Sequence, residues 1–169
     1  MHLRQWVFND RVSFARLNSD PQVVEFLPKA LSQEESDGFA ERIEEHFQQH
    51  GFGLWAVEIL GVTQFAGFIG LSIPTFEAHF TPCVEIGWRL APAYWNCGYA
   101  TEGALAVLKF GFKFLRVNEI VSFTVPSNVR SRRVMEKIGM TYVPSDEFDH
   151  PKLPEGHPLR RHVLYRKVS

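Results

Sequence analysis

A strand, a helix and a second strand follow one another between residues 83 and 125. The first strand is predicted over 83–90 and the second over 119–125, because both runs have the composition of strands. The helix between them is indicated by apolar residues at three- and four-residue intervals, namely Leu105, Leu108, Phe112 and Leu115. Since a strand–helix–strand unit crosses back over its own sheet, the two strands are expected to run parallel.

Two more helices are predicted, from Ser32 to Gly51 and from Ser127 or Asn128 to Gly139. The former opens with a capping-type Ser-Gln-Glu-Glu and carries an apolar residue every four positions: Phe39, Ile43 and Phe47. The latter presents an inward stripe made of Val134, Met135 and Ile138. Both helices end at a glycine, the residue that best tolerates a left-handed terminator.

Further strands are predicted over 3–8, 53–60, 65–72 and 162–168, and the chain between the last helix and the last strand is broken by prolines. A short connection at 61–63 and a longer one that contains Pro74 and Pro82 join the strands between 53 and 90, which together look like an antiparallel meander. The predicted fold class is therefore α/β (α+β), with a mixed, mostly antiparallel central sheet and helices on both faces. A length of 169 residues with 45% hydrophobic content predicts a single domain over residues 1–169.

Charge and cysteine usage exclude several functional classes. The 18 basic and 19 acidic residues give a net charge of −1, so no overall field attracts nucleic acid or an anionic membrane. Only Cys83 and Cys97 are present, no secretory leader is evident and no apolar stretch is long enough to span a bilayer. A cytoplasmic protein with free thiols is expected, acting on a specific ligand.

The chemistry is expected where the strand ending at Leu90 is followed by a short turn containing Gly98 and then at once by a helix. This order directs several backbone N–H groups and the positive end of the helix dipole at one place, which favours binding of a phosphate. A lone glycine before a helix is also an ordinary turn. The spacing matches neither a Walker loop nor a dinucleotide fingerprint.

Several motifs in order resemble the GNAT superfamily of N-acetyltransferases, and most closely its RimJ/RimL-like branch. They are the segments 3–6, 85–90, 95–101, 128–131 and 136–140. The resemblance implies a coenzyme A site between two neighbouring strands that splay apart. In such proteins the backbone of the first strand, here Trp88, Arg89 and Leu90, pairs with the amides of the pantetheine arm.

The resemblance also implies which residues hold the coenzyme phosphates. The loop that would wrap the pyrophosphate consists of Asn96, Cys97, Gly98, Tyr99, Ala100 and Thr101. Trp95 stands where the common family pattern has Gln or Arg, so backbone donors must do most of the holding. Asn128 is similar to a family asparagine that bonds the pantetheine, and it is equally suited to cap the next helix.

Arg130, Arg132 and Arg133 form the only dense basic cluster in the chain. One of them, with Arg133 preferred, is expected to contact the coenzyme phosphates. A solvated helix face is an equally good interpretation. Nucleic-acid contact is a third one, which would give salt-dependent RNA binding, but no other feature of the sequence supports it.

Two residues are candidates for acid–base chemistry. Attack on a thioester requires a neutral amine, and by resemblance Glu85 is the base that takes the amine proton. Its alternative role is a strand carboxylate paired with an arginine. Met135 stands where many relatives carry an acidic tyrosine, so the resemblance assigns to Ser131 the hydroxyl that donates to the departing thiolate. Ser131 could instead be a small residue that lets the cofactor approach.

Covalent and metal-dependent chemistry is not expected. Cys97 has no neighbouring base to activate it, which favours direct transfer in a ternary complex. His150, His157 and His162 match no standard zinc spacing, so no metal is predicted. His79, His150 and His157 are expected near the acceptor pocket or on the surface.

The predicted function is transfer of an acetyl group from acetyl-CoA to a primary amine, either a protein N-terminus or a small amine. The alternative is a binding module that senses acyl-CoA without turnover. RimJ/RimL resemblance suggests a ribosomal protein N-terminus as acceptor, although similar proteins act on amino acids, polyamines and drugs. No nucleic-acid or membrane partner is expected, and a homodimer is the working expectation for the assembly.

Overall fold

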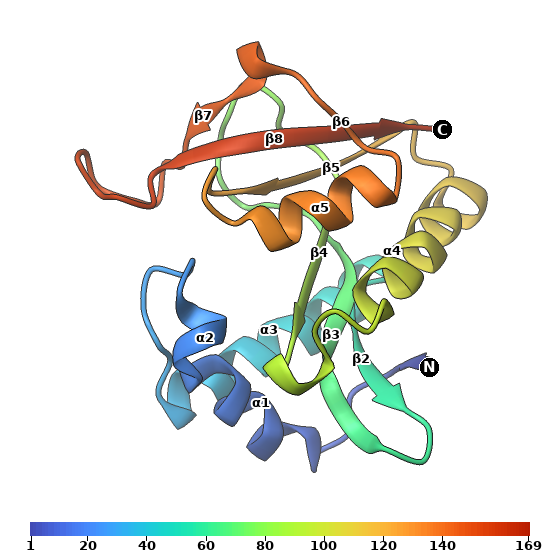
Figure 1. Cartoon of the computed structure of the whole chain (residues 1–169). Helices are drawn as coiled ribbons and strands as arrows, with labels where there is room; N and C mark the ends of the chain where they lie inside the picture. The colour runs from blue at the N-terminus through green and yellow to red at the C-terminus, as the bar shows by residue number, and fades with distance from the viewer.

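The computed structural model describes residues 1–169 and is built on an eight-stranded sheet (Figure 1). The strands are β1 (His2–Arg4), β2 (Leu54–Ile59), β3 (Thr63–Ser72), β4 (Glu85–Leu90), β5 (Glu119–Thr124), β6 (Thr141–Tyr142), β7 (Phe148–Asp149) and β8 (Arg161–Val168). Their spatial order is β1-β2-β3-β4-β5-β8-β6, with β7 also paired to β8. Only the β4–β5 ladder is parallel, which confirms the predicted mixed, mostly antiparallel sheet.

Helices cover both faces of this sheet. They are α1 (Asp10–Ser19), α2 (Pro21–Val24), α3 (Gln33–His50), α4 (Tyr99–Phe110) and α5 (Val129–Lys137). A π-helical turn, Gly111–Leu115, extends α4. On one face α1 and α3 pack against the β2–β3 hairpin through a cluster around Phe14 and Phe68. On the other face α4 and α5 share a larger cluster with β3 and β4 around Ile69 and Ile86.

Local signals explain the two helices whose ends were predicted. The Ser32 hydroxyl accepts from the Glu35 amide and the Glu35 carboxylate accepts from the Ser32 amide, so α3 begins with a capping box. It ends at Gly51 in the left-handed region with φ 74°. Helix α5 begins after Asn128 and is followed by Gly139 with φ 75°. Both predictions are confirmed.

The parallel crossover is also confirmed, but its ladder is minimal. Strands β4 and β5 share one bridge, between Glu85 and Val121. Beyond this bridge the two strands diverge, as Figure 1 shows for β4 running down and β5 running across. The splayed strand pair expected from the resemblance is therefore present, and it opens the sheet next to Glu85.

Four details differ from the predictions. The opening strand ends at Arg4, because the Asp10 carboxylate accepts from the Val7 amide and pairs with Arg4, which turns the chain into α1. Helices α1 and α2 were not predicted at all. Leu105 is 48% exposed, since α4 turns Ala104, Val107 and Leu108 inward instead. The proline-broken segment contains β6 and β7.

No helix in the structure combines the length and the apolar character that a bilayer crossing requires. The two cysteines, Cys83 and Cys97, are free.

Candidate active site

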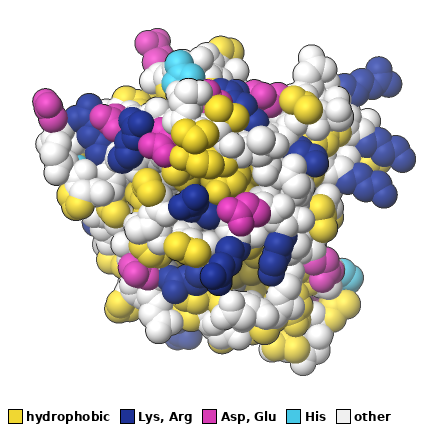
Figure 2. Space-filling model, turned by 45° about the horizontal axis from the view of Figure 1, so that its top comes forward, with side chains coloured by type: hydrophobic (Ala, Val, Ile, Leu, Met, Phe, Trp, Pro, Cys, Tyr) yellow, Lys and Arg dark blue, Asp and Glu magenta, His cyan; other side chains and the backbone are white.

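A cleft with a volume of about 1000 Å³ opens where β4 and β5 diverge. One wall consists of the 94–101 loop and the start of α5. The opposite wall consists of α2, α3 and the segments around residues 74–76 and 150–162. In Figure 2 several Lys and Arg side chains surround a hollow that contains apolar side chains. The cleft therefore joins a basic rim to an apolar interior.

The edge of β4 that faces the cleft carries unpaired backbone groups. Because the Ala91 amide donates to the Ala66 carbonyl, the ladder directs the backbone of Arg89 toward β3 and those of Trp88 and Leu90 toward the open edge. The Leu90 carbonyl accepts from the Trp95 indole at 2.7 Å. Of the three strand residues predicted to bind pantetheine, Trp88 and Leu90 thus present backbone groups to the cleft, whereas Arg89 presents only its side chain.

The loop after β4 is shaped by two left-handed residues, Asn96 with φ 60° and Gly98 with φ 86°. They turn the chain so that α4 starts at Tyr99 with Gly98 as its N-cap. The first amides of a helix have no partner within it, so the amides that open α4 form a site with a positive field. Such a site suits an anionic group.

The structure brings four of the six predicted loop residues to the cleft wall: Asn96, Gly98, Ala100 and Thr101. Cys97 and Tyr99 do not line it. The Cys97 thiol is exposed and donates to the Trp95 carbonyl at 3.3 Å, and the Tyr99 side chain packs on the core.

The three arginines of α5 have different environments. Arg132 donates to the Tyr165 hydroxyl and to the Pro126 carbonyl, so it is a structural residue. Arg130 pairs with Glu25 at 2.8 Å and stacks over Trp95 with its guanidinium 4.5 Å from the ring centroid. Arg133 has no ion pair or hydrogen bond within the protein and lines the cleft.

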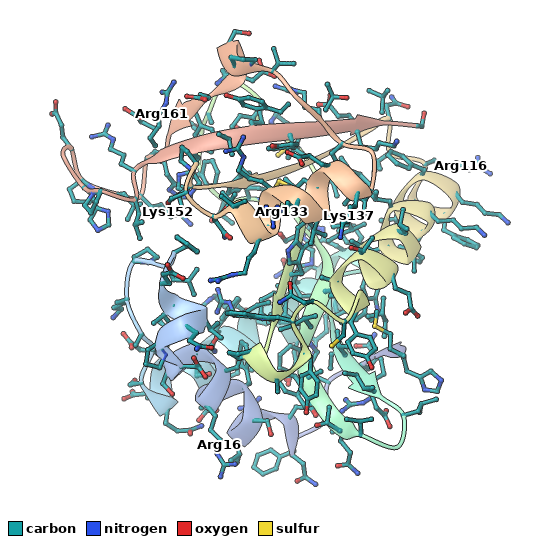
Figure 3. The ribbon with its side chains drawn as sticks, viewed as in Figure 1. Arg16, Arg116, Arg133, Lys137, Lys152 and Arg161 are labelled. Carbon is teal, nitrogen blue, oxygen red and sulfur yellow. The ribbon has the colours of Figure 1, made fainter.

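Figure 3 shows Arg133 and Lys137 on the edge of α5 nearest α4. Neither side chain has a partner within the protein, and both line the cleft. Their charges therefore add to the field of the α4 N-terminus. Sequence reasoning missed Lys137, and it also missed the Glu25–Arg130–Trp95 contact, which joins segments 105 residues apart.

Asn128 acts as the N-cap of α5. Its Oδ1 accepts from the Ser131 amide at 3.2 Å and its Nδ2 donates to the Thr124 hydroxyl at 3.0 Å. One N–H of the side-chain amide stays available on the cleft side. The capping role is present, and it leaves a donor for a ligand.

Glu85 lies at the point of divergence and lines the cleft. Its only polar side-chain contact is the Ser72 hydroxyl, at 3.5 Å, and it takes part in no ion pair. Burial raises the pKa of the Glu85 carboxyl to about 8, and the contact with Ser72 offsets this only in part. The alternative of an arginine-paired carboxylate is therefore not what the structure shows.

Ser131 lines the same cleft from the first turn of α5. Its amide is used by the Asn128 cap, whereas its hydroxyl has no partner within the protein. Met135, one turn later, is 1% exposed and belongs to the core. Glu85 and Ser131 thus face one cleft from β4 and from α5.

Two of the histidines named from the sequence, His150 and His162, lie in the cleft wall, whereas His79 and His157 do not. The rings of His150 and His162 are 5.1 Å apart within a group of phenylalanines. Burial lowers the pKa of His150 to about 4, so its ring is uncharged at neutral pH. No group of three His, Cys, Asp or Glu side chains is placed to hold a metal.

A third histidine of the cleft, His46, was not named from the sequence. Its Nδ1 lies 2.8 Å from the Phe52 carbonyl and its Nε2 accepts from the Ile73 amide. Together these bonds require a neutral ring, and burial lowers the pKa of His46. His46 is therefore a fixed part of the wall.

Comparison with known proteins places this cleft in context. Residues 1–141 match the family described as Acetyltransferase (GNAT) domain. The chain is 30% identical to the uncharacterized N-acetyltransferase YnaD of Bacillus subtilis over 82% of this chain and 77% of that protein. A GNAT-family acetyltransferase from Bacillus anthracis superposes with a TM-score of 0.78 at 28% identity, covering 98% and 93% of the two chains.

Another solved structure, RimJ of Mycobacterium smegmatis in complex with CoA-disulfide, shares the fold with a TM-score of 0.76. Its identity is 20%, over 99% of this chain and 81% of that one.

Proposed function

Because the chain belongs to the GNAT acetyltransferases and is thus an acetyl-CoA-dependent enzyme, we propose that it transfers the acetyl group directly to a primary amine in a ternary complex. The cleft at the divergence of β4 and β5 supports this proposal most strongly. It exposes backbone groups on one side and the amides that open α4 on the other. An unpaired carboxyl and a free hydroxyl lie within it.

The substrate acetyl-CoA fits this cleft by chemistry. The amides that begin α4, with Arg133 and Lys137, would hold its phosphates. The backbone of Trp88 and the free amide N–H of Asn128 would hold the pantetheine. These assignments use donors that have no partner within the protein.

The proposed chemistry needs one base and one hydrogen-bond donor. The amine nitrogen bonds to the thioester carbonyl carbon, the carbon–sulfur bond breaks, and the amine proton passes to the Glu85 carboxylate. The Ser131 hydroxyl donates to the departing thiolate. The products are an amide, the coenzyme thiolate and protonated Glu85.

Two acceptor classes fit this chemistry, a protein N-terminus and a small amine. A RimJ/RimL-like role on a ribosomal protein would belong to the first class. The alternative function is an acyl-CoA sensor, and the buried Met135 in place of an acidic tyrosine is the feature that favours it. Thiol release from acetyl-CoA, measured with a panel of amines and peptides, separates the two: a sensor binds acetyl-CoA and releases no thiol with any acceptor.

We expect Gly98→Val to abolish most of the thermal stabilisation that acetyl-CoA gives to the protein. An added Cβ at Gly98 would meet no atom within 4 Å, so the effect comes from the left-handed backbone, which valine avoids. A displaced loop no longer presents the amides that open α4. Differential scanning fluorimetry with and without acetyl-CoA measures the result, since a ligand bound to the native state raises Tm by mass action.

Gly61→Val is the matched control. Gly61 has φ 72° in the β2–β3 turn, its added Cβ also meets nothing, and it lies outside the cleft. Both variants should lose intrinsic stability, but only Gly98→Val should lose the response to acetyl-CoA. An unchanged response in Gly98→Val would show that the loop is not the phosphate site.

A further inference from the structure

The charges that line the cleft are strongly unbalanced. Its only carboxylate is Glu85, whereas six cationic side chains line it: Arg42, Arg89, Arg130, Arg133, Lys137 and Lys152. Three of these cations lie on α5, next to the loop that suits phosphates. Binding of the coenzyme phosphates would account for the three cations of α5. It does not account for Arg42, Arg89 and Lys152.

Arg89 is a guanidinium in an apolar environment without a counter-ion. It takes part in no ion pair, and its Nη1 donates to the Oδ1 of the fully buried Asn18 at 2.6 Å. It stacks on Phe68 with its Cζ 5.4 Å from the ring centroid. Its other nitrogens have no partner within the protein and are not sealed from solvent. Burial lowers the pKa of Arg89 to about 10, in agreement with an uncompensated charge.

Arg42, on α3, contacts the same aromatic ring as Arg89 but is exposed to solvent. It lines the cleft, makes no ion pair, and lies over the ring of Phe39 with its Cζ 5.6 Å from the centroid. Arg89 lies 5.8 Å from the centroid of the same ring. Both guanidinium groups therefore lie within 6 Å of the centre of one ring, and neither has a counter-ion, so an anion that reaches both would be bound favourably.

The space between this pair and Glu85 is open. Glu85, Gly87 and Arg89 alternate along β4 and therefore point to the same face of the sheet. An added Cβ at Gly87 would meet no atom within 4 Å. Cα atoms four residues apart on a strand are separated by about 13 Å, which leaves room for a small molecule between the carboxyl and the guanidinium.

We infer that the acceptor is a small amine that also carries an anionic group, a carboxylate or a phosphate. The amine lies at Glu85 and the anion at Arg89 and Arg42. This inference rests on the proposed function and narrows its substrate class. Polyamines are disfavoured, because the cleft offers no second carboxylate to a second ammonium.

Matched acceptors test the inference. Glycine, β-alanine, γ-aminobutyrate and L-phenylalanine are compared with the amino alcohols of the same skeletons, and O-phosphoethanolamine with ethanolamine. We expect kcat/KM to be higher for the anionic member of the best pair by on the order of tenfold to a hundredfold, the range of a hydrogen bond to a charged group. The two arms show whether a carboxylate or a phosphate is preferred. Equal rates within every pair, or a preference for spermidine or for peptides regardless of charge, would overturn the inference.

Variants of the two arginines test whether these side chains cause the preference for anionic acceptors. Arg89→Met and Arg42→Met should each reduce the ratio of kcat/KM for the anionic acceptor to kcat/KM for its neutral partner toward one, and Arg89→Lys should restore part of this ratio. Arg16→Met is the control, because Arg16 lies on α1 away from the cleft (Figure 3). Loss of the Asn18 contact alone would lower both rates together and leave the ratio unchanged, which would make Arg89 a structural residue.

Anion recognition also has a readout that needs no turnover. With coenzyme A present, the anionic member of a pair should raise Tm more than the alcohol, and Arg89→Met should remove the difference. If no amine released thiol but the difference in Tm between the anionic amine and the alcohol persisted, the proposed enzymatic function would be wrong and the anion site would be supported. Turnover without any preference for the anionic acceptor, in rate or in Tm, would contradict the anion site and leave the proposed enzymatic function intact.

Discussion

Glu85→Gln will lower turnover with a confirmed amine acceptor by about a hundredfold to ten-thousandfold at neutral pH, the range expected for loss of a positioned base. Glutamine keeps the size of the side chain but cannot accept the proton. Affinity for acetyl-CoA should change little, because Glu85 contacts the loop of α4 through no hydrogen bond or ion pair. Steady-state thiol release measures kcat and KM separately.

The pH profile distinguishes a base from a structural carboxyl. The pKa of Glu85 is raised to about 8 by burial, so the active carboxylate form increases as the pH rises through this value and levels off above it. In the variant, turnover depends on the amine losing its own proton, and an alkylamine does so only near pH ~10.4. The difference in turnover between the wild type and Glu85→Gln should therefore decrease above about pH 8. Glu155→Gln, at an exposed carboxyl outside the cleft, is the control. Wild-type turnover in Glu85→Gln at neutral pH would remove Glu85 as the base.

The same ionisation affects stability. The pKa of Glu85 in the folded protein lies above its ordinary value of 4.5, so the folded state binds the proton more tightly than the unfolded state. The resulting stabilisation is present at low pH and is lost as the pH rises through about 8. The Tm of the wild type should thus fall relative to that of Glu85→Gln between about pH 5 and pH 9. Parallel Tm curves would indicate an ordinary pKa.

Ser131→Ala will also lose turnover by about a hundredfold to ten-thousandfold, because the thiolate would leave without its donor. The Asn128 cap uses the backbone amide of residue 131, so α5 should still form and acetyl-CoA should still bind. Thermal shift with acetyl-CoA and steady-state kinetics together test this.

Ser127→Ala is the matched control for this variant, because Ser127 is an exposed serine just before α5 and does not line the cleft. Full turnover in Ser131→Ala would mean that another group, or water, protonates the thiolate. Loss of acetyl-CoA binding would instead support the view that Ser131 lets the cofactor approach.

Elements with strong local signals could be predicted from the sequence. The capping box at Ser32 and the glycines at 51 and 139 act over a few residues, so α3 and α5 were recovered. Helix α1 lacks such signals: its Asn9 cap makes no side-chain hydrogen bond, and its buried residues include Asp10 and Asn18. Asn18 is buried because Ser36 and Arg89, which lie 18 and 71 residues away, satisfy its side chain, and a linear sequence does not show such partners.

The position of the candidate site could also be predicted in part. Motif order and family resemblance located Glu85, Asn128 and Ser131, which the structure brings to one cleft. The environment of Arg89 was not predictable, since its partner Asn18 lies 71 residues away and its main feature is a missing carboxylate. A pattern of residues can show which charges a chain has, but only the fold shows which of them lack a counter-ion.

The sheet is incomplete at the open edge between β4 and β5. A further strand there would pair with the groups that β4 leaves unpaired beyond Glu85, but the chain supplies none. On the proposed placement, the amides of pantetheine lie beside β4 where this strand would be and form the hydrogen bonds that its backbone would form. The cofactor then completes the sheet beside β4, and this part of the sheet is replaced each time a new acetyl-CoA molecule binds.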